Sequence, residues 1–228
     1  MYNRGRKKKI SNKKYAVLGL GRFGIEMAKS LSELGCEVFA VDKKEDNLRA
    51  LDGIATHMAT ANVANEGVLT EFDIQEFDAV IVAIGDLSSS IMTTQLCKDL
   101  GAKYVIAKAN DEVHAKILEK VGADKIVFPE VYTAQRMATV LFNPNINELI
   151  EMEDGYSIAQ VNLPKSWEGK DVVTLDIRKQ YALNILFVIG LDGVSLPSQG
   201  RHFVEGDKIV IGGLNDAVTD FLTKEISE

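Results

Sequence analysis

Short apolar runs alternate with helical patterns over the first two thirds of the chain. Runs bounded by turn-forming residues predict buried strands at residues 15–18, 37–41, 79–84, 104–107 and 125–128. Apolar spacing predicts intervening helices at residues 22–34, from Ser88 onward, at 111–121 and at 131–142. This alternation is typical of a parallel sheet joined by crossover helices, so we predict an α/β, Rossmann-like doubly wound domain.

The pattern changes at residues 143–145, where Asn-Pro-Asn ends the last of these helices. Apolar and polar residues then alternate over 159–163, as in a half-exposed strand. Asp192-Gly193, between two apolar runs, predicts a β-hairpin, and a further strand and a final helix follow. We therefore expect a basic tail at 1–13, a Rossmann domain at 14–143, and a linker with a small α+β domain at 144–228.

Charge is spread unevenly along the 228 residues. The net charge is −7, but the first 14 residues hold seven basic residues and no acid, so the remainder carries −14. Such an acidic body repels a phosphate backbone, and we expect no nucleic-acid partner. The basic segment is expected to be a solvated arm, with contact to anionic lipid or an acidic partner surface as the alternative.

The composition indicates a globular chain that does not enter the bilayer by itself. Hydrophobic residues make up 46% of it, without a run approaching the roughly 18 that a membrane span needs. Cys36 and Cys97 are isolated, which fits reduced thiols, and the N-terminus lacks a signal-peptide pattern. We therefore expect a cytoplasmic protein.

A phosphate-binding fingerprint follows the first strand and opens the first helix. It reads Gly19-Leu20-Gly21-Arg22-Phe23-Gly24. In such a GxGxxG loop the first glycine permits a tight turn, the second lets a phosphate approach the backbone, and the third allows close packing of helix on strand. Free N–H groups at the helix start then hold the anion.

Asp42 strengthens this prediction, since it lies at the end of the next strand, 18 residues after Gly24. A carboxylate there accepts hydrogen bonds from ribose hydroxyls and repels a 2′-phosphate, which argues against NADP. Arg22 adds a fork of donors suited to terminal phosphate oxygens and favours ATP or ADP over a dinucleotide. The alternative for Arg22 is a solvated arginine at the helix start.

The sequence does not indicate an enzyme. The three histidines, His57, His114 and His202, show no relay with a carboxylate, and each is expected to be structural or solvated. Hydrolase, zinc-protease and Walker motifs are missing as well. The alternative is a small NAD-dependent oxidoreductase or an NADH redox sensor.

Together with the Phe128-Pro129-Glu130 strand end, these features resemble the KtrA/TrkA-type RCK proteins, cytosolic regulatory subunits of bacterial potassium uptake systems. The resemblance covers essentially residues 14–228. It implies an RCK N-terminal and an RCK C-terminal domain, and homodimers assembled into a ring, taken as an octamer. It also implies a membrane-embedded channel subunit of the KtrB/TrkH type as partner, beneath which the ring lies at the inner face of the membrane.

The resemblance also assigns site residues. Asn62 stands where many TrkA-like members have aspartate, and Ala61 replaces their glycine, which favours the Ktr branch and weakens an NAD preference. Glu130 matches an acid that helps to hold Mg²⁺ or another cation near ATP phosphates; its alternative is a surface glutamate. The nucleotide-binding residues implied are Gly19, Gly21, Arg22, Phe23, Gly24, Asp42, Lys43, Asn62, Ala83, Gly85 and Glu130.

A second ligand, cyclic di-AMP, is implied for the C-terminal domain. The segments that resemble its binding site in Ktr-type members contain Ile177, Arg178, Asn184, Ile185 and Pro197. Arginine suits phosphates, and asparagine suits a base or a backbone edge. The alternative is an exposed arginine and an ordinary strand asparagine. Trp167 is expected to anchor packing rather than to stack on a ligand.

Overall fold

The computed structural model describes residues 11–198 and 200–226. The chain divides into two compact units, Met1–Pro129 and Glu130–Glu228. Residues 1–10 of the expected basic tail lie outside the described residues.

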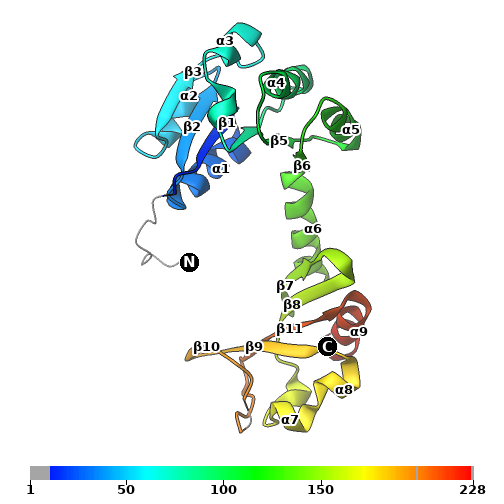
Figure 1. The fold of residues 1–228 in the computed structure, drawn as a ribbon. Helices are drawn as coiled ribbons and strands as arrows, with labels where there is room; N and C mark the ends of the chain where they lie inside the picture. Colours follow the sequence, from blue (N-terminus) through cyan, green and yellow to red (C-terminus); the bar gives the residue numbers. More distant parts are fainter. Residues whose placement is uncertain (1–10, 199, 227–228) are drawn as a thin grey trace. The chain divides into compact units, whose positions relative to one another are not determined.

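The first unit is a six-stranded sheet flanked by helices (Figure 1). The strand order is β3-β2-β1-β4-β5-β6, and every neighbouring pair is parallel. The strands are β1 (Lys14–Leu18), β2 (Glu37–Asp42), β3 (His57–Thr60), β4 (Ala79–Val82), β5 (Val105–Lys108) and β6 (Lys125–Val127). Between them lie α1 (Arg22–Glu33), α2 (Glu45–Leu48), α3 (Glu66–Thr70), α4 (Leu87–Asp99), α5 (Glu112–Lys120) and two short 3₁₀ turns, Arg49–Leu51 and Ile74–Glu76. This topology confirms the predicted doubly wound α/β fold.

Alternation along β1 places successive side chains in different cores. Val17 packs in a cluster with Ala28 of α1, whereas Ala16 and Leu18 pack in a cluster with Cys97 of α4. The two helices therefore cover opposite faces of the sheet. The strand order reverses between β1 and β4, and at such a switch point a crevice opens at the carboxyl edge.

The second unit is a five-stranded sheet in the order β10-β9-β11-β8-β7, with antiparallel pairs. Its strands are β7 (Ile146–Glu151), β8 (Tyr156–Asn162), β9 (Asn184–Gly190), β10 (Gly193–Ser195) and β11 (Lys208–Leu214). Its helices are α6 (Pro129–Phe142), α7 (Val172–Leu175), α8 (Ile177–Tyr181) and α9 (Asn215–Glu225). Short 3₁₀ turns lie at Glu153–Gly155 and Lys165–Trp167. The predicted α+β character and the hairpin at Asp192-Gly193 are confirmed.

Aromatic side chains hold this smaller core together. Trp167 is 4% exposed, and its ring centroid lies 5.4 Å from that of Phe221 and 6.4 Å from that of Phe203. Tyr181 meets Phe221 edge-on, at 5.3 Å between centroids. Trp167 is therefore a packing anchor, as predicted.

Two local expectations differ from the structure. Helix α4 begins at Leu87, and its N-cap is Asp86 rather than Ser88, because the Asp86 carboxylate accepts a hydrogen bond from the N–H of Ser89. The boundary between units falls at Pro129 and Glu130, whereas the sequence pattern placed it after residue 143. Helix α6 lies between the observed boundary and the expected one, and none of its residues is buried. Within the described ranges, no helix is long and apolar enough to cross a membrane.

Candidate functional site

A cavity lies at the carboxyl edge of the first sheet, at the switch point between β1 and β4. Its volume is about 180 Å³. Pockets that enclose a whole small ligand measure roughly 300–1,000 Å³, so a nucleotide held here would lie partly exposed. Seven of the residues predicted from the sequence line this cavity: Gly19, Gly21, Asp42, Lys43, Asn62, Ala83 and Gly85.

The three glycines of the fingerprint have separate steric roles. Gly19 adopts a φ of +94° and its N–H donates to the oxygen of Val41 at 2.8 Å, which fixes the turn after β1. A Cβ on Gly24 would lie 2.0 Å from the oxygen of Gly19, so α1 packs on the loop only with glycine there. A Cβ on Gly21 would meet no heavy atom within 4 Å. Space for a ligand therefore exists beside Gly21.

Helix α1 begins beside this open space. Gly21 is its N-cap, and among the described residues neither a capping side chain nor an acid in the first turn neutralises the helix end. The first N–H groups of a helix lack intrahelical partners and carry the positive end of the helix dipole. This end of the cavity is therefore suited to an anion such as a phosphate.

Asp42 ties the loop to the end of β2 and is only 9% exposed. One carboxylate oxygen accepts the N–H of Leu20 at 2.6 Å, and the other accepts the N–H of Lys44 at 2.8 Å. A carboxylate offers about four lone-pair sites, so both oxygens keep capacity for further donors. Asp42 can accept hydroxyl hydrogen bonds while it holds the loop.

A second carboxylate, that of Asp86, borders the cavity on the α4 side. It accepts hydrogen bonds from the hydroxyl of Ser89 at 2.6 Å and from its N–H at 2.9 Å. These bonds, with a smaller effect of the Lys43 charge, hold the pKa of Asp86 below its ordinary value. The α4 side thus carries a negative charge, and an anionic group is directed toward α1.

The remaining residues of the predicted nucleotide site lie outside the lining. Arg22 is exposed at the first position of α1, Phe23 packs against the core of that helix, and Gly24 is buried. Glu130 lies in the first turn of α6 and belongs to the second unit. Among the described residues, no group of three or more His, Cys, Asp or Glu side chains could hold a metal ion.

Sequence reasoning missed five lining residues: Ala61, Val63, Ile84, Asp86 and Ser89. A signal existed for Asp86, because Asp-Leu-Ser-Ser after a buried strand is a typical helix start, and strand ends of this fold face the ligand. Val63 and Ile84 carry no signal of their own, and Ala61 was noted only as a mark of the Ktr branch. They line the cavity only because parallel strands end at the same edge.

The residues implied for a second ligand fall into two groups. Ile177 and Ile185 are 4% and 8% exposed and belong to the core of the second unit. Arg178, in α8, and Asn184, at the start of β9, are exposed, and Pro197 follows β10. Only these last three present surface that a ligand could reach.

Comparison with known proteins decides the family. The family model of the TrkA-N domain matches residues 15–129. Ktr system potassium uptake protein C of Bacillus subtilis is 38% identical over 207 residues, which cover 90% of this chain and 94% of that protein. The chain belongs to the Ktr family of potassium uptake proteins. Ktr system potassium uptake protein A of Vibrio alginolyticus is 31% identical over 94% of this Ktr chain and 98% of its own length.

Solved structures agree with the fold of this Ktr-family chain. The GsuK channel matches with a TM-score of 0.69 and 16% identity over 96% of this chain. The crystal structure of the GsuK RCK domain matches with a TM-score of 0.68 and 16% identity over the same share. The Ktr chain spans 40% of the GsuK channel chain and 49% of the RCK-domain chain. The predicted resemblance to RCK proteins is thereby confirmed at the level of fold.

Proposed function

We propose that this chain is the nucleotide-sensing regulatory subunit of a potassium uptake system. The observation that carries the proposal is the cavity beside Gly21, where an uncapped helix start and the Asp42 carboxylate lie on one edge of the sheet. That arrangement suits a phosphate and a ribose together. The relatives named as potassium uptake proteins supply the process that the nucleotide would control.

ATP and ADP are the proposed ligands, with Mg²⁺ or another cation beside Glu130 when ATP is bound. Arg22 stands at the first residue of α1, where its guanidinium is free to meet terminal phosphates. ATP and ADP differ there by one phosphate. A ligand shifts a conformational equilibrium only through contacts that differ between the states, and this phosphate provides such a difference. NAD or NADH is the competing ligand, since one similar solved structure is that of the GsuK channel bound to NAD.

Calorimetric titration with ATP, ADP and NADH, with and without magnesium, tests this assignment. We expect ATP and ADP to bind the wild-type protein, and Arg22→Ala to weaken ATP more than ADP. Arg49→Ala is the matched control, because Arg49 is exposed and its ion pair is with Asp46, away from the cavity. Binding of NADH alone would support the redox-sensor alternative instead.

Cyclic di-AMP is the proposed second ligand, with Arg178, Asn184 and Pro197 as its proposed contacts. Ile177 and Ile185 would support these residues from the core. Arg178→Ala should abolish cyclic di-AMP binding and leave ADP binding unchanged. Lys179→Ala provides the control, since Lys179 is the next exposed cation of α8. Equal loss in both variants would indicate nonspecific electrostatic binding.

A regulatory role without catalysis also agrees with the positions of the histidines. His114 is fully buried, and no histidine lines the cavity within the described part of the chain. We therefore propose no catalytic activity. The proposed partner is a membrane-embedded channel subunit of the KtrB/TrkH type, beneath which the protein acts at the cytoplasmic face of the membrane.

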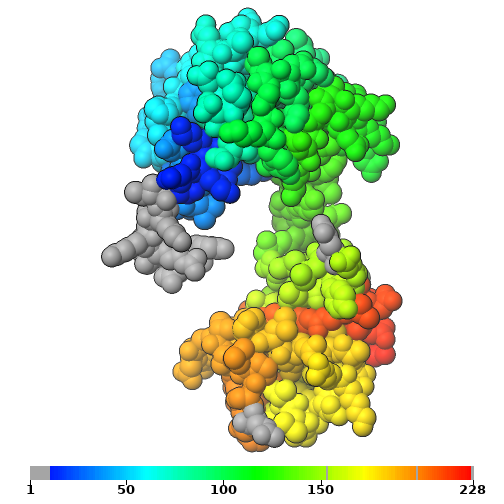
Figure 2. Space-filling model, in the orientation of Figure 1, coloured from blue at the N-terminus to red at the C-terminus, as the bar shows by residue number. Residues whose placement is uncertain are grey.

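Self-association is proposed through α6, first as a homodimer and then as an octameric ring. Figure 2 shows the green surface of this part of the chain, and several large apolar side chains of α6 are exposed. The most exposed are Phe142 at 90% and Leu141 at 79%. An exposed apolar helix is typical of an interface with another protein.

A further inference from the structure

A second loop reaches the wall of the nucleotide cavity from the neighbouring strand. Asn110 follows β5, and its side-chain amide donates to the main-chain oxygen of Gly85, with 2.8 Å between Nδ2 and O. Gly85 follows β4 and lines the cavity. The direction of this carbonyl is therefore set from outside the loop that contains it.

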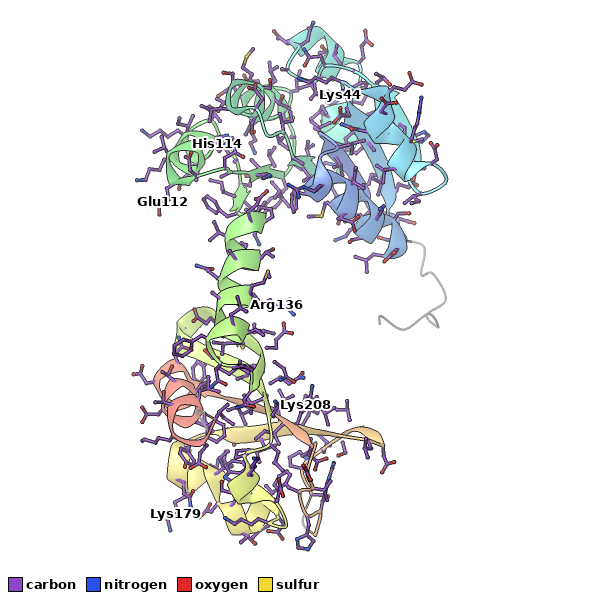
Figure 3. The ribbon with its side chains drawn as sticks, turned by 180° about the vertical axis from the view of Figure 1, so that it is seen from behind. Lys44, Glu112, His114, Arg136, Lys179 and Lys208 are labelled. Atoms are coloured by element: carbon purple, nitrogen blue, oxygen red, sulfur yellow. The ribbon has the colours of Figure 1, made fainter. Side chains whose placement is uncertain are left out.

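Asn110 is itself held by α5. Its N–H donates to Nδ1 of His114, with 3.2 Å between the nitrogens. The N–H of His114 donates in turn to the side chain of Asp111, the N-cap of α5, at 2.8 Å. Figure 3 labels His114 on this helix, and its side chain is fully buried. A chain of contacts thus runs from α5 through Asn110 to Gly85.

Packing alone does not account for an imidazole at this position. Because Nδ1 accepts a hydrogen bond, the ring is neutral and carries its proton on Nε2. Among the described residues, Nε2 has no hydrogen-bond partner, although buried polar atoms normally have one. An apolar side chain would fill the space without that unpaired donor. What the imidazole adds is the acceptor for Asn110.

We propose that Asn110 and His114 are positioning residues for the nucleotide cavity, which fix the Gly85 carbonyl and so make nucleotide affinity depend on α5. The inference rests on the proposed nucleotide function. A glycine peptide rotates easily, and a freed carbonyl could turn its oxygen toward an anionic ligand and repel it. Held by Asn110, the carbonyl stays fixed.

The test compares two aspartate variants by titration with ADP. Asn110→Asp loses the amide donor, whereas Asn65→Asp, the control, keeps an acceptor for the N–H of Gly67 at the start of α3. Both variants add one negative charge to the first unit. We expect the dissociation constant to rise about fivefold or more for Asn110→Asp, as for one lost hydrogen bond, and less than twofold for Asn65→Asp.

Hydrogen exchange of the ligand-free protein separates positioning from a direct contact with the nucleotide. Amides of residues 83–90 should exchange faster in Asn110→Asp than in the wild type. His114→Leu should produce the same two effects, and the double variant should bind ADP no more weakly than either single variant. If His114→Leu does not fold, ADP titration and hydrogen exchange of Asn110→Asp alone test the inference.

The outcomes are distinct. A wild type that binds ADP, with Asn110→Asp within twofold of it, contradicts the inference and leaves the proposed function intact. Weaker binding without faster exchange contradicts positioning as the cause. A wild type that binds no adenine nucleotide contradicts the proposed function, and the inference falls with it.

Discussion

At the scale of single residues, the fingerprint loop contains one glycine that packing requires and another that faces the cavity. Gly24→Ala would place a methyl group 2.0 Å from the oxygen of Gly19, so loop and helix must move apart. We expect this change to lower the free energy of unfolding by about 2–3 kcal/mol, the magnitude of an overpacked site. Urea denaturation measures it.

Gly21→Ala is the matched change, since its methyl group would meet no heavy atom within 4 Å. We expect it to lower stability by no more than about 1 kcal/mol, the cost of replacing an N-cap glycine by alanine. It should nevertheless weaken ADP binding, because the methyl group takes the space of the phosphate. Equal losses of stability in the two variants would contradict the steric account.

His114 predicts a pH dependence of stability. Burial lowers the pKa of His114 below its ordinary value of about 6.5, so the unfolded chain binds the proton more tightly than the folded one. Stability should therefore fall as the pH drops below about 6.5, down to the pKa of the folded state. Urea denaturation at pH 7.5 and 5.5 checks this. His114→Leu should lose that part of the dependence, whereas His57→Asn, at an exposed position, should retain it.

The sequence identified the cavity-lining residues that belong to a motif, and missed those that depend on three-dimensional neighbours. Gly19, Gly21 and Asp42 follow from the fingerprint and its spacing. Val63 is an ordinary residue in any linear reading, and Ala61 was singled out only as a mark of the Ktr branch; both line the cavity because β3 ends beside β2. Asn110 reaches Gly85 across 25 positions of sequence, and no spacing rule predicts that contact.

At the scale of elements, the N-cap of α4 is Asp86 in the structure, whereas the sequence pattern placed the helix start at Ser88. Asp86→Ala should lower the free energy of unfolding by about 1 kcal/mol, because the N–H of Ser89 loses its capping acceptor. Ser88→Ala, at the expected helix start, should change it by less than about 0.5 kcal/mol, as exposed positions do. A larger loss for Ser88→Ala in thermal or urea unfolding would restore Ser88 as the cap.

Elements with a long apolar period were predictable, and short ones were not. Strands β1, β2, β4, β5 and β6 overlap the predicted apolar runs, whereas β3, which reads His-Met-Ala-Thr, was not among those runs. Helices α1 and α5 keep their predicted spans to within one residue at each end. Helices α2, α3, α7 and α8 have only four or five residues, too few to repeat an apolar spacing. Strand β7 was missed because Glu148 and Glu151 interrupt its apolar residues and a register shift between Ile146 and Glu148 breaks the alternation.

At the scale of the whole molecule, α6 exposes large apolar side chains that no contact described within one chain covers. None of its described residues is buried, and Arg136, labelled in Figure 3, forms an ion pair with Glu148 of β7 at 2.6 Å. Leu141→Glu combined with Phe142→Glu should convert the proposed dimer to a monomer in sedimentation velocity. Leu191→Glu, at a fully exposed hairpin position, is the control and should leave the assembly unchanged. A wild-type monomer would contradict the proposal.

We propose that an adenine nucleotide binds at the carboxyl edge of the first sheet with its ribose on Asp42. The most direct measurement compares ADP with its 2′-phosphorylated derivative by calorimetric titration of the wild-type protein. Asp42 is buried and fixed by two N–H groups, so its carboxylate cannot swing away from a second negative charge. We expect ADP to bind at least about tenfold more tightly than its 2′-phosphorylated derivative, a difference of about 1.4 kcal/mol in the free energy of binding. Equal affinity for the two ligands, or no binding of ADP, would contradict it.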